Sequence, residues 1–258
     1  MFKFINNLFS SYKKNPEIKI DTTIVVDDEL NPAREMLKEA TILKKEKKYE
    51  EACNKLKDAF AAQGSGDLMV KERMRLAIYL QLAKKNDEGW KVLNELNVKY
   101  TDVFSQAEIA NQMRVFLQKE KKYTQALLFS VWGICKEVER DRSNIQGSIE
   151  LTDEMASNAR AYSFPGEDKK QEVYGKTPQG NPITDSAYRM FSDRIKKSVS
   201  KDGVSDRIQP LLKKAKKEEL LEAISTVVSE YLKSTENYDL RDIRDSINEL
   251  LSRKETAV

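Results

Sequence analysis

Histidine is absent from the 258 residues of this chain, and cysteine occurs only twice. Without histidine the chain lacks the commonest general base and the commonest metal ligand, and no Ser–His or Cys–His nucleophile can form. Two thiols without a histidine do not make an ordinary zinc site. The only clustered glycines, Gly64-Ser65-Gly66, lack the Lys-Ser/Thr that follows in a phosphate-binding loop. We therefore expect no catalytic residues, no metal site and no cofactor.

Long apolar runs are also absent. No run approaches the roughly 20 residues that span a bilayer, and the first residues, MFKFINNLFSSYKK, lack the small-residue cleavage site of a signal peptide. We expect a cytoplasmic protein, in which Cys53 and Cys135 are buried free thiols.

Glycine and proline are few, at nine and six residues, which favours helices joined by short turns. The composition is 40% apolar and 34% charged, so the chain can form a core and still solvate many helix faces. The net charge of +3 is too close to balance for the whole chain to be a polyanion-binding protein.

A pattern of two helices is present three times between Ala33 and Val138, at a spacing of 37 residues. A shared period of this size is typical of helical repeat arrays. The columns that step by 37 residues are Leu43, Leu80 and Leu117; Tyr49, Asn86 and Tyr123; Ala52, Gly89 and Ala126; and Lys48, Lys85 and Lys122.

The first copy resembles a tetratricopeptide (TPR) repeat. That family has a small residue where the second helix crosses the first, here Ala40, and an aromatic residue at the start of the second helix, here Tyr49. Small residues let the helices approach closely. The other copies depart from the pattern at Asn86, where the aromatic is missing, and at Arg114, where a small residue is expected. The spacing also exceeds the family's usual period of about 34.

The resemblance implies a concave groove lined by the first helix of each repeat. The residues that this register places in the groove are Arg34, Leu37, Lys38, Thr41, Lys44, Lys45, Lys71, Met74, Ile78, Gln81, Glu108, Asn111, Val115, Gln118 and Lys119. The groove would be basic at its N-terminal end, apolar in the middle and polar at the far end. It suits an extended or helical peptide with acidic and apolar anchors. The carboxylate clamp, a specialised form of the family, is excluded because Thr41 and Glu108 replace its Asn and Lys.

Three other segments flank this array. Residues 1–30 predict a short amphipathic helix and an extended stretch, and the helix either packs on the protein or lies as a foot on a membrane surface. Residues 31–162 hold the repeats and a separate capping helix near Ile149–Ala159. Residues 163–182 are rich in Pro and Gly and predict a loop or linker, and residues 183–258 predict a helical bundle.

We conclude that the chain is an all-α protein with a TPR-like array followed by a small C-terminal bundle. We expect a non-catalytic adaptor or complex subunit that binds a segment of a protein partner in the groove. The alternative is a nucleic-acid-associated protein that uses a basic patch in the C-terminal helices, formed by Lys213, Lys214, Lys216 and Lys217. The patch has no interleaved aromatic residues, so a solvated helix face also explains it.

Overall fold

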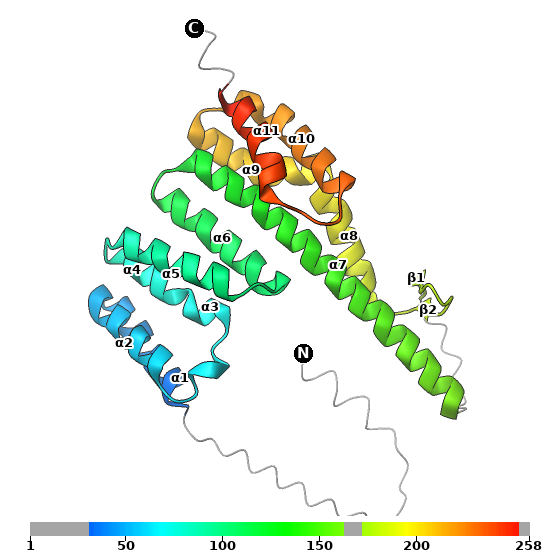
Figure 1. The fold of residues 1–258 in the computed structure, drawn as a ribbon, viewed down its shortest axis with the longest axis horizontal. Coiled ribbons are helices and arrows are strands. Elements are labelled where there is room, and N and C mark those ends of the chain that lie inside the picture. Colours follow the sequence, from blue (N-terminus) through cyan, green and yellow to red (C-terminus); the bar gives the residue numbers. More distant parts are fainter. Residues whose placement is uncertain (1–30, 163–171, 253–258) are drawn as a thin grey trace, which may run out of the picture. The chain divides into compact units, whose positions relative to one another are not determined.

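The computed structural model describes residues 31–162 and 172–252, so the predictions made for residues 1–30 lie outside the described residues. The described part is helical apart from one pair of two-residue strands, which confirms the all-α prediction (Figure 1). Its α-helices are α1 (Pro32–Lys45), α2 (Tyr49–Ala61), α3 (Val70–Arg73), α4 (Arg75–Leu82), α5 (Asn86–Lys99), α6 (Val103–Lys119), α7 (Tyr123–Tyr162), α8 (Ser186–Val199), α9 (Lys201–Ala215), α10 (Leu221–Ser234) and α11 (Leu240–Ser252). The 3₁₀ turns are η1 (Ser65–Asp67) and η2 (Glu218–Leu220), and the strands are β1 (Gly175–Lys176) and β2 (Pro182–Ile183).

The 37-residue spacing is visible in the backbone of three turns. The pairs α1–α2, α4–α5 and α6–α7 are each joined through a lysine with positive φ: Lys47 at 64°, Lys84 at 65° and Lys121 at 61°. In the first turn, the Lys48 amide donates to the Leu43 carbonyl at 2.9 Å and the Lys47 amide donates to the Lys44 carbonyl at 3.1 Å. The other two turns repeat both bonds 37 and 74 residues later. This is the Schellman arrangement, which satisfies the last carbonyls of a helix.

Helices α1 to α6 pack on one another through both small and large apolar residues. One core cluster joins α1, α2 and α4 around Ala40, Ala52 and Leu56, all of which are fully buried. A second cluster joins α4, α5 and α6 around Leu93 and Phe116. Each hairpin therefore buries an apolar face against the next one, as stacked helical hairpins require.

The close crossing of α5 with its neighbours depends on Gly89. A Cβ atom at this position would lie 2.7 Å from Cζ of Phe116 and 3.2 Å from the carbonyl oxygen of Ala77. The Phe116 ring is fully buried and packs edge-on against Trp90, with 4.9 Å between the ring centroids. The ring therefore has little freedom to move away from an added side chain.

We expect Gly89→Ala to lower the free energy of unfolding by about 1–3 kcal/mol, because overpacking outweighs alanine's higher helix propensity. Chemical denaturation measures the change. Gly133→Ala in α7 is the control, because its Cβ meets no atom within 4 Å, and it should stabilise the protein by up to about 1 kcal/mol. Equal changes in the free energy of unfolding for the two substitutions would contradict the close approach of α5 to Phe116 at Gly89.

The positive φ of the turn lysines gives a second prediction. A side chain in the left-handed region strains the backbone, so Lys84→Gly should raise the free energy of unfolding by about 0.5–1 kcal/mol. Lys57→Gly, at an exposed position in the middle of α2, should lower it by about 1 kcal/mol. Urea unfolding of both variants tests this, and a loss of stability in Lys84→Gly would argue against the strained turn.

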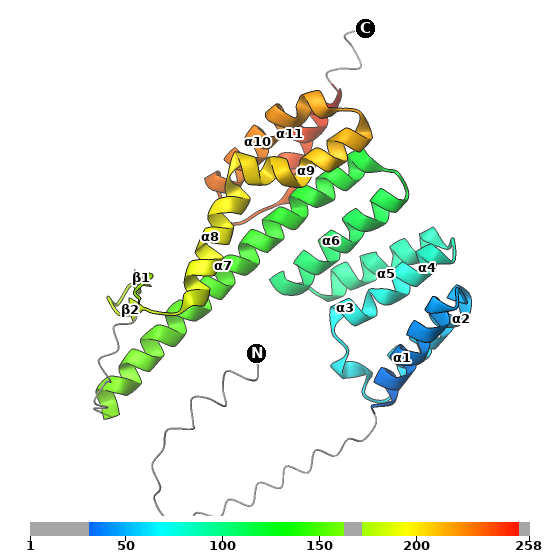
Figure 2. The ribbon, with the colours of Figure 1, turned by 180° about the vertical axis from the view of Figure 1, so that it is seen from behind.

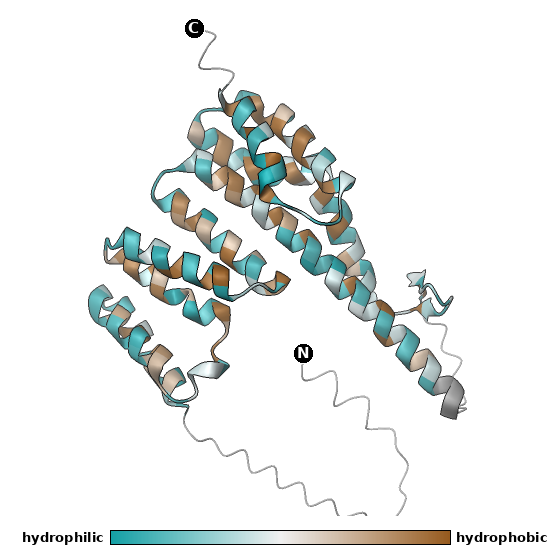
Figure 3. Cartoon of the chain, viewed as in Figure 1, coloured by the Kyte–Doolittle hydropathy of each residue, from teal (hydrophilic) through white to brown (hydrophobic). Residues whose placement is uncertain are grey.

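Helix α7 corrects the prediction of a separate capping helix. Residues 123–162 form one continuous helix of 40 residues, so the segment near Ile149 continues the helix that begins at Tyr123. Along its C-terminal half the helix is mostly hydrophilic (Figure 3). Polar contacts begin in the middle of the helix, where Arg194 Nε of α8 lies 3.2 Å from Asp141 Oδ2, and continue where the Ser148 hydroxyl donates to Asp185 at 2.8 Å. Residues 139–144 are all polar, so the apolar pattern is interrupted there and resumes near Ile149, which suggested two helices in place of one.

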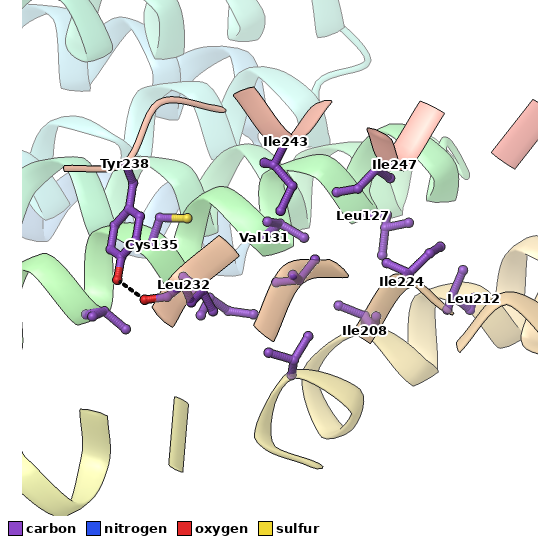
Figure 4. Packing of buried hydrophobic residues seen from close by; sticks show 14 of the residues in the cluster. Leu127, Val131, Cys135, Ile208, Leu212, Ile224, Leu232, Tyr238, Ile243 and Ile247 are labelled. Atoms are coloured by element: carbon purple, nitrogen blue, oxygen red, sulfur yellow. Dashed lines mark hydrogen bonds between the residues drawn. The ribbon is translucent and has the colours of Figure 1, made fainter. Parts of the chain in front are cut away.

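The C-terminal helices complete their core on the first half of α7. Leu127, Val131 and Cys135 of α7 lie among side chains of α9, α10 and α11 (Figure 4). The Tyr238 hydroxyl, beside Cys135, donates to the Leu232 carbonyl at 2.8 Å and closes one end of this core. The bundle therefore shares a core with α7 and is not a separate domain.

Of the segment predicted as a loop, residues 163–182, the structure describes residues 172–182. They belong to a small antiparallel hairpin. Gly175 pairs with Ile183, and Gly180 has a φ of 86° in the turn. Ile183 is fully buried, and the Asn181 amide donates to Asp153 of α7 at 2.7 Å. The hairpin is therefore fastened to α7, which a loop of this composition did not indicate.

Candidate functional site

Figures 1 and 2 show the helices α1, α3, α4 and α6 side by side. Two neighbouring hollows lie along these helices. The larger has a volume of about 430 Å³ and is lined by Lys71, Glu72, Met74, Arg75, Ile78, Glu108, Asn111 and Gln112. The smaller has a volume of about 210 Å³ and is lined by Arg34, Leu37, Lys38, Thr41, Glu72 and Arg75. Because Glu72 and Arg75 line both, we treat the two hollows together and call them the groove.

Most residues predicted for the groove lie in its walls. The structure brings together Arg34, Lys38, Lys71, Met74, Ile78 and Asn111, and with them Leu37, Thr41 and Glu108. Their role in binding a partner remains a prediction. The geometry agrees with a register in which the first helix of each hairpin presents the same face.

Other predicted groove residues lie elsewhere. Lys44 and Lys45 are in the last turn of α1, outside the lining of either hollow, and Lys119 lines a different hollow near the helix-joining turns. Gln81 is only 7% exposed, and its amide donates to the Phe116 carbonyl at 3.0 Å. This placement corrects the expectation that Gln81 faces the groove, because the end of α4 lies against α6.

Sequence reasoning missed Arg75, which lies where the two hollows meet. Its Nη2 donates to the Leu37 carbonyl at 2.9 Å, to the Thr41 hydroxyl at 2.5 Å and to the Tyr79 hydroxyl at 3.2 Å. Its guanidinium also lies 5.7 Å from the centroid of the Tyr79 ring. The 37-residue step could have identified this residue, because Lys38, Arg75 and Gln112 form one column.

Arg75 is half-buried in the groove and forms no ion pair there, although Glu72 and Glu108 also line the larger hollow. All three acceptors of its hydrogen bonds are neutral, and it makes no ion pair with any residue in the described ranges 31–162 and 172–252. By contrast, Arg34 lies 3.0 Å from Glu72, and Lys38 lies 2.6 Å from Glu35. A half-buried charge without a counter-ion attracts an anionic group more strongly than a paired one.

Apolar side chains lie beside this charge. Met74 is 5% exposed and Ile78 is half-buried, and both line the larger hollow. Lys71 and Glu108 are exposed at its rim. The groove thus combines an apolar floor, a fixed positive charge and polar rims, which together can hold a short peptide segment.

The predicted basic patch lies at the end of α9. Lys213 and Lys214 are in the last helical turn, and Lys216 has a φ of 58°. Lys217 donates its Nζ to the Leu251 carbonyl at 2.7 Å and so caps the end of α11. At least one of the four lysines therefore has a structural role.

The two cysteines are buried in different clusters. Burial raises the pKa of Cys53 above its ordinary value and raises the pKa of Cys135 to about 12. Both thiols are therefore neutral at physiological pH and poor nucleophiles. Within the described part of the chain, no three His, Cys, Asp or Glu residues are grouped so that they could hold a metal ion.

Comparisons with protein-family models, with curated protein sequences and with solved structures found no match to this chain. None of the helices within residues 31–162 and 172–252 combines the length and the apolar character needed to cross a membrane.

The burial of the thiols predicts slow alkylation of the native protein. At pH 8 both groups are protonated in the folded state, because their pKa values are raised, so we expect a thiol reagent to react at least about tenfold more slowly than in urea. Cys135→Ala should leave the alkylation rate of the native protein almost unchanged, because burial raises the pKa of Cys135 more than that of Cys53. A fast native reaction that disappears in Cys135→Ala would contradict this order.

Proposed function

We propose that this protein is a cytoplasmic, non-catalytic interaction module, an adaptor or subunit of a larger assembly. In this proposal the three hairpins act as TPR-like repeats, and the groove receives a peptide segment of a protein partner. The observation that carries the proposal is the guanidinium of Arg75, which lies between two hollows and forms no ion pair with a described residue. The two buried free thiols suit a reducing compartment.

The rigidity of Arg75 supports a binding role. Three hydrogen bonds and the Tyr79 ring hold the guanidinium in place. A partner that pairs with it loses little additional side-chain entropy from the protein, which favours affinity. A mobile surface lysine would contribute less to such a contact.

The surroundings define the chemistry of the partner. A carboxylate in the peptide pairs with Arg75, and a neighbouring apolar side chain enters the larger hollow over Met74 and Ile78. The paired residues Arg34 and Glu72 form the wall beside the carboxylate. We therefore propose a partner segment with an acidic residue close to a large apolar one.

Selection from a displayed library of short random peptides tests this chemistry. We expect the intact protein to enrich peptides with an Asp or Glu near a large apolar residue. Arg75→Gln keeps hydrogen-bond donors but removes the charge, so it should weaken the selected peptides by about 10- to 100-fold. Fluorescence anisotropy of labelled peptides measures the change.

Lys91→Gln is the matched control, since Lys91 is exposed on α5 and lines neither hollow of the groove. It should leave peptide affinity within about twofold of the intact protein. Unfolding curves of the two variants check that each remains folded. If the selected peptides bind Arg75→Gln as tightly as they bind the intact protein, the proposed site is wrong.

A further inference from the structure

Lysines from four separate turns gather along one edge of the described structure. Three of these turns join α1–α2, α4–α5 and α6–α7, and the fourth joins α9 to η2. The residues of this lysine edge are Lys44, Lys45, Lys47, Lys48, Lys84, Lys85, Lys119, Lys121, Lys122, Lys213, Lys214, Lys216 and Lys217. It unites the predicted basic patch with groove candidates that lie outside the groove.

Contacts between the turns show that the edge is continuous. Lys85 of the second turn lies 2.9 Å from Glu50, next to the first turn. A hollow of about 360 Å³ is lined by Tyr49, Lys84 and Lys119, one from each of the first three turns. The Nζ of Lys214 lies 5.8 Å from the ring centroid of Tyr123, at the start of α7. Figures 1 and 2 show the turns following one another on the same side.

Much of the charge along this edge has no ion-pair partner among the described residues. Three lysines pair with carboxylates, in Lys48–Glu46, Lys85–Glu50 and Lys122–Glu120, and Lys217 bonds a carbonyl. The others make no ion pair with residues 31–162 or 172–252: Lys44, Lys45, Lys47, Lys84, Lys119, Lys121, Lys213, Lys214 and Lys216. A lysine at the end of a helix is favoured by the helix dipole. For an exposed side chain that effect is only about 0.3–1 kcal/mol for each charge, and salt screens it.

The backbone adds a second observation. Lys47, Lys84, Lys121 and Lys216 all have positive φ, between 58° and 65°, and no other non-glycine residue among those described does. Glycine is the residue that stability alone favours in this conformation. A lysine at all four positions therefore costs backbone energy and adds positive charge at the tip of each turn.

We propose that the lysine edge binds the phosphate backbone of nucleic acid without reading its sequence. A line of turns matches a linear polyanion, because successive phosphates can contact successive turns. Lysine provides point charges, whereas arginine, which is absent from the edge, provides bidentate recognition. Among the exposed large apolar residues of the described chain, Ile42 alone is close to the edge, two residues before Lys44. One such side chain does not make the apolar face of a membrane-binding surface.

Anisotropy of a labelled mixed-sequence DNA duplex, measured between about 50 and 200 mM salt, tests the proposal. The edge variant combines Lys44→Gln, Lys45→Gln, Lys119→Gln and Lys213→Gln, which leaves the positive-φ residues intact. We expect at least about tenfold weaker binding at low salt. The slope of log K against log salt is negative, and we expect its magnitude to fall by about 3–4. The control carries Lys57→Gln, Lys99→Gln, Lys176→Gln and Lys233→Gln, the same loss of charge at exposed positions elsewhere.

Binding that the edge variant loses and the control keeps supports the proposal. Equal losses in the two variants overturn it, because they assign the affinity to net charge alone. Absence of binding at low salt also overturns it. Vesicles that contain an anionic phospholipid form the last arm, and retention by vesicles without binding to DNA would assign the edge to lipid headgroups. Unfolding curves confirm that both variants are folded.

Discussion

The burial of α7 on two sides is the constraint on which the rest of the structure depends. One face of its first half packs on α6 through Ala126 and Leu117, and the next face supplies Val131 and Cys135 to the core of the C-terminal helices. A helix that is apolar on most of its circumference must be covered on most of it. The hairpins and the bundle are therefore parts of one compact unit.

This constraint explains why the groove and the lysine edge have fixed positions. The stacked hairpins place the first helices on one face, where Arg75 of α4 bonds the carbonyl of Leu37 in α1. They also place the helix-joining turns on one edge, to which α9 adds a fourth turn because it packs on α7. One stacking order thus gives two charged surfaces with different geometry, one concave and one linear.

The sequence predicted those features that repeat. The helical period and the 37-residue step predicted the helices and the turns, because both depend on local spacing. The residues of the groove wall came from the resemblance to TPR repeats. The continuity of α7 was not predictable, because the polar run of residues 139–144, where Asp141 pairs with Arg194, interrupts the apolar pattern in the middle of the helix. That Arg75 donates to neutral oxygens and forms no ion pair with a described residue also depends on tertiary contacts, and the sequence gives no sign of it. The small hairpin was not predicted, because strands of two residues have no recognisable sequence pattern.

The shared core on α7 has a consequence for synthesis on the ribosome. Val138 of α7 and Ile247 of α11 belong to the same cluster. At about 5–20 residues per second, roughly 5–20 s pass between the synthesis of these two positions. During this time the hairpins can already fold, while the apolar face of α7 waits without its cover. At this stage the apolar face of α7 is exposed to solvent and to other proteins, and it stays exposed in products truncated before α11.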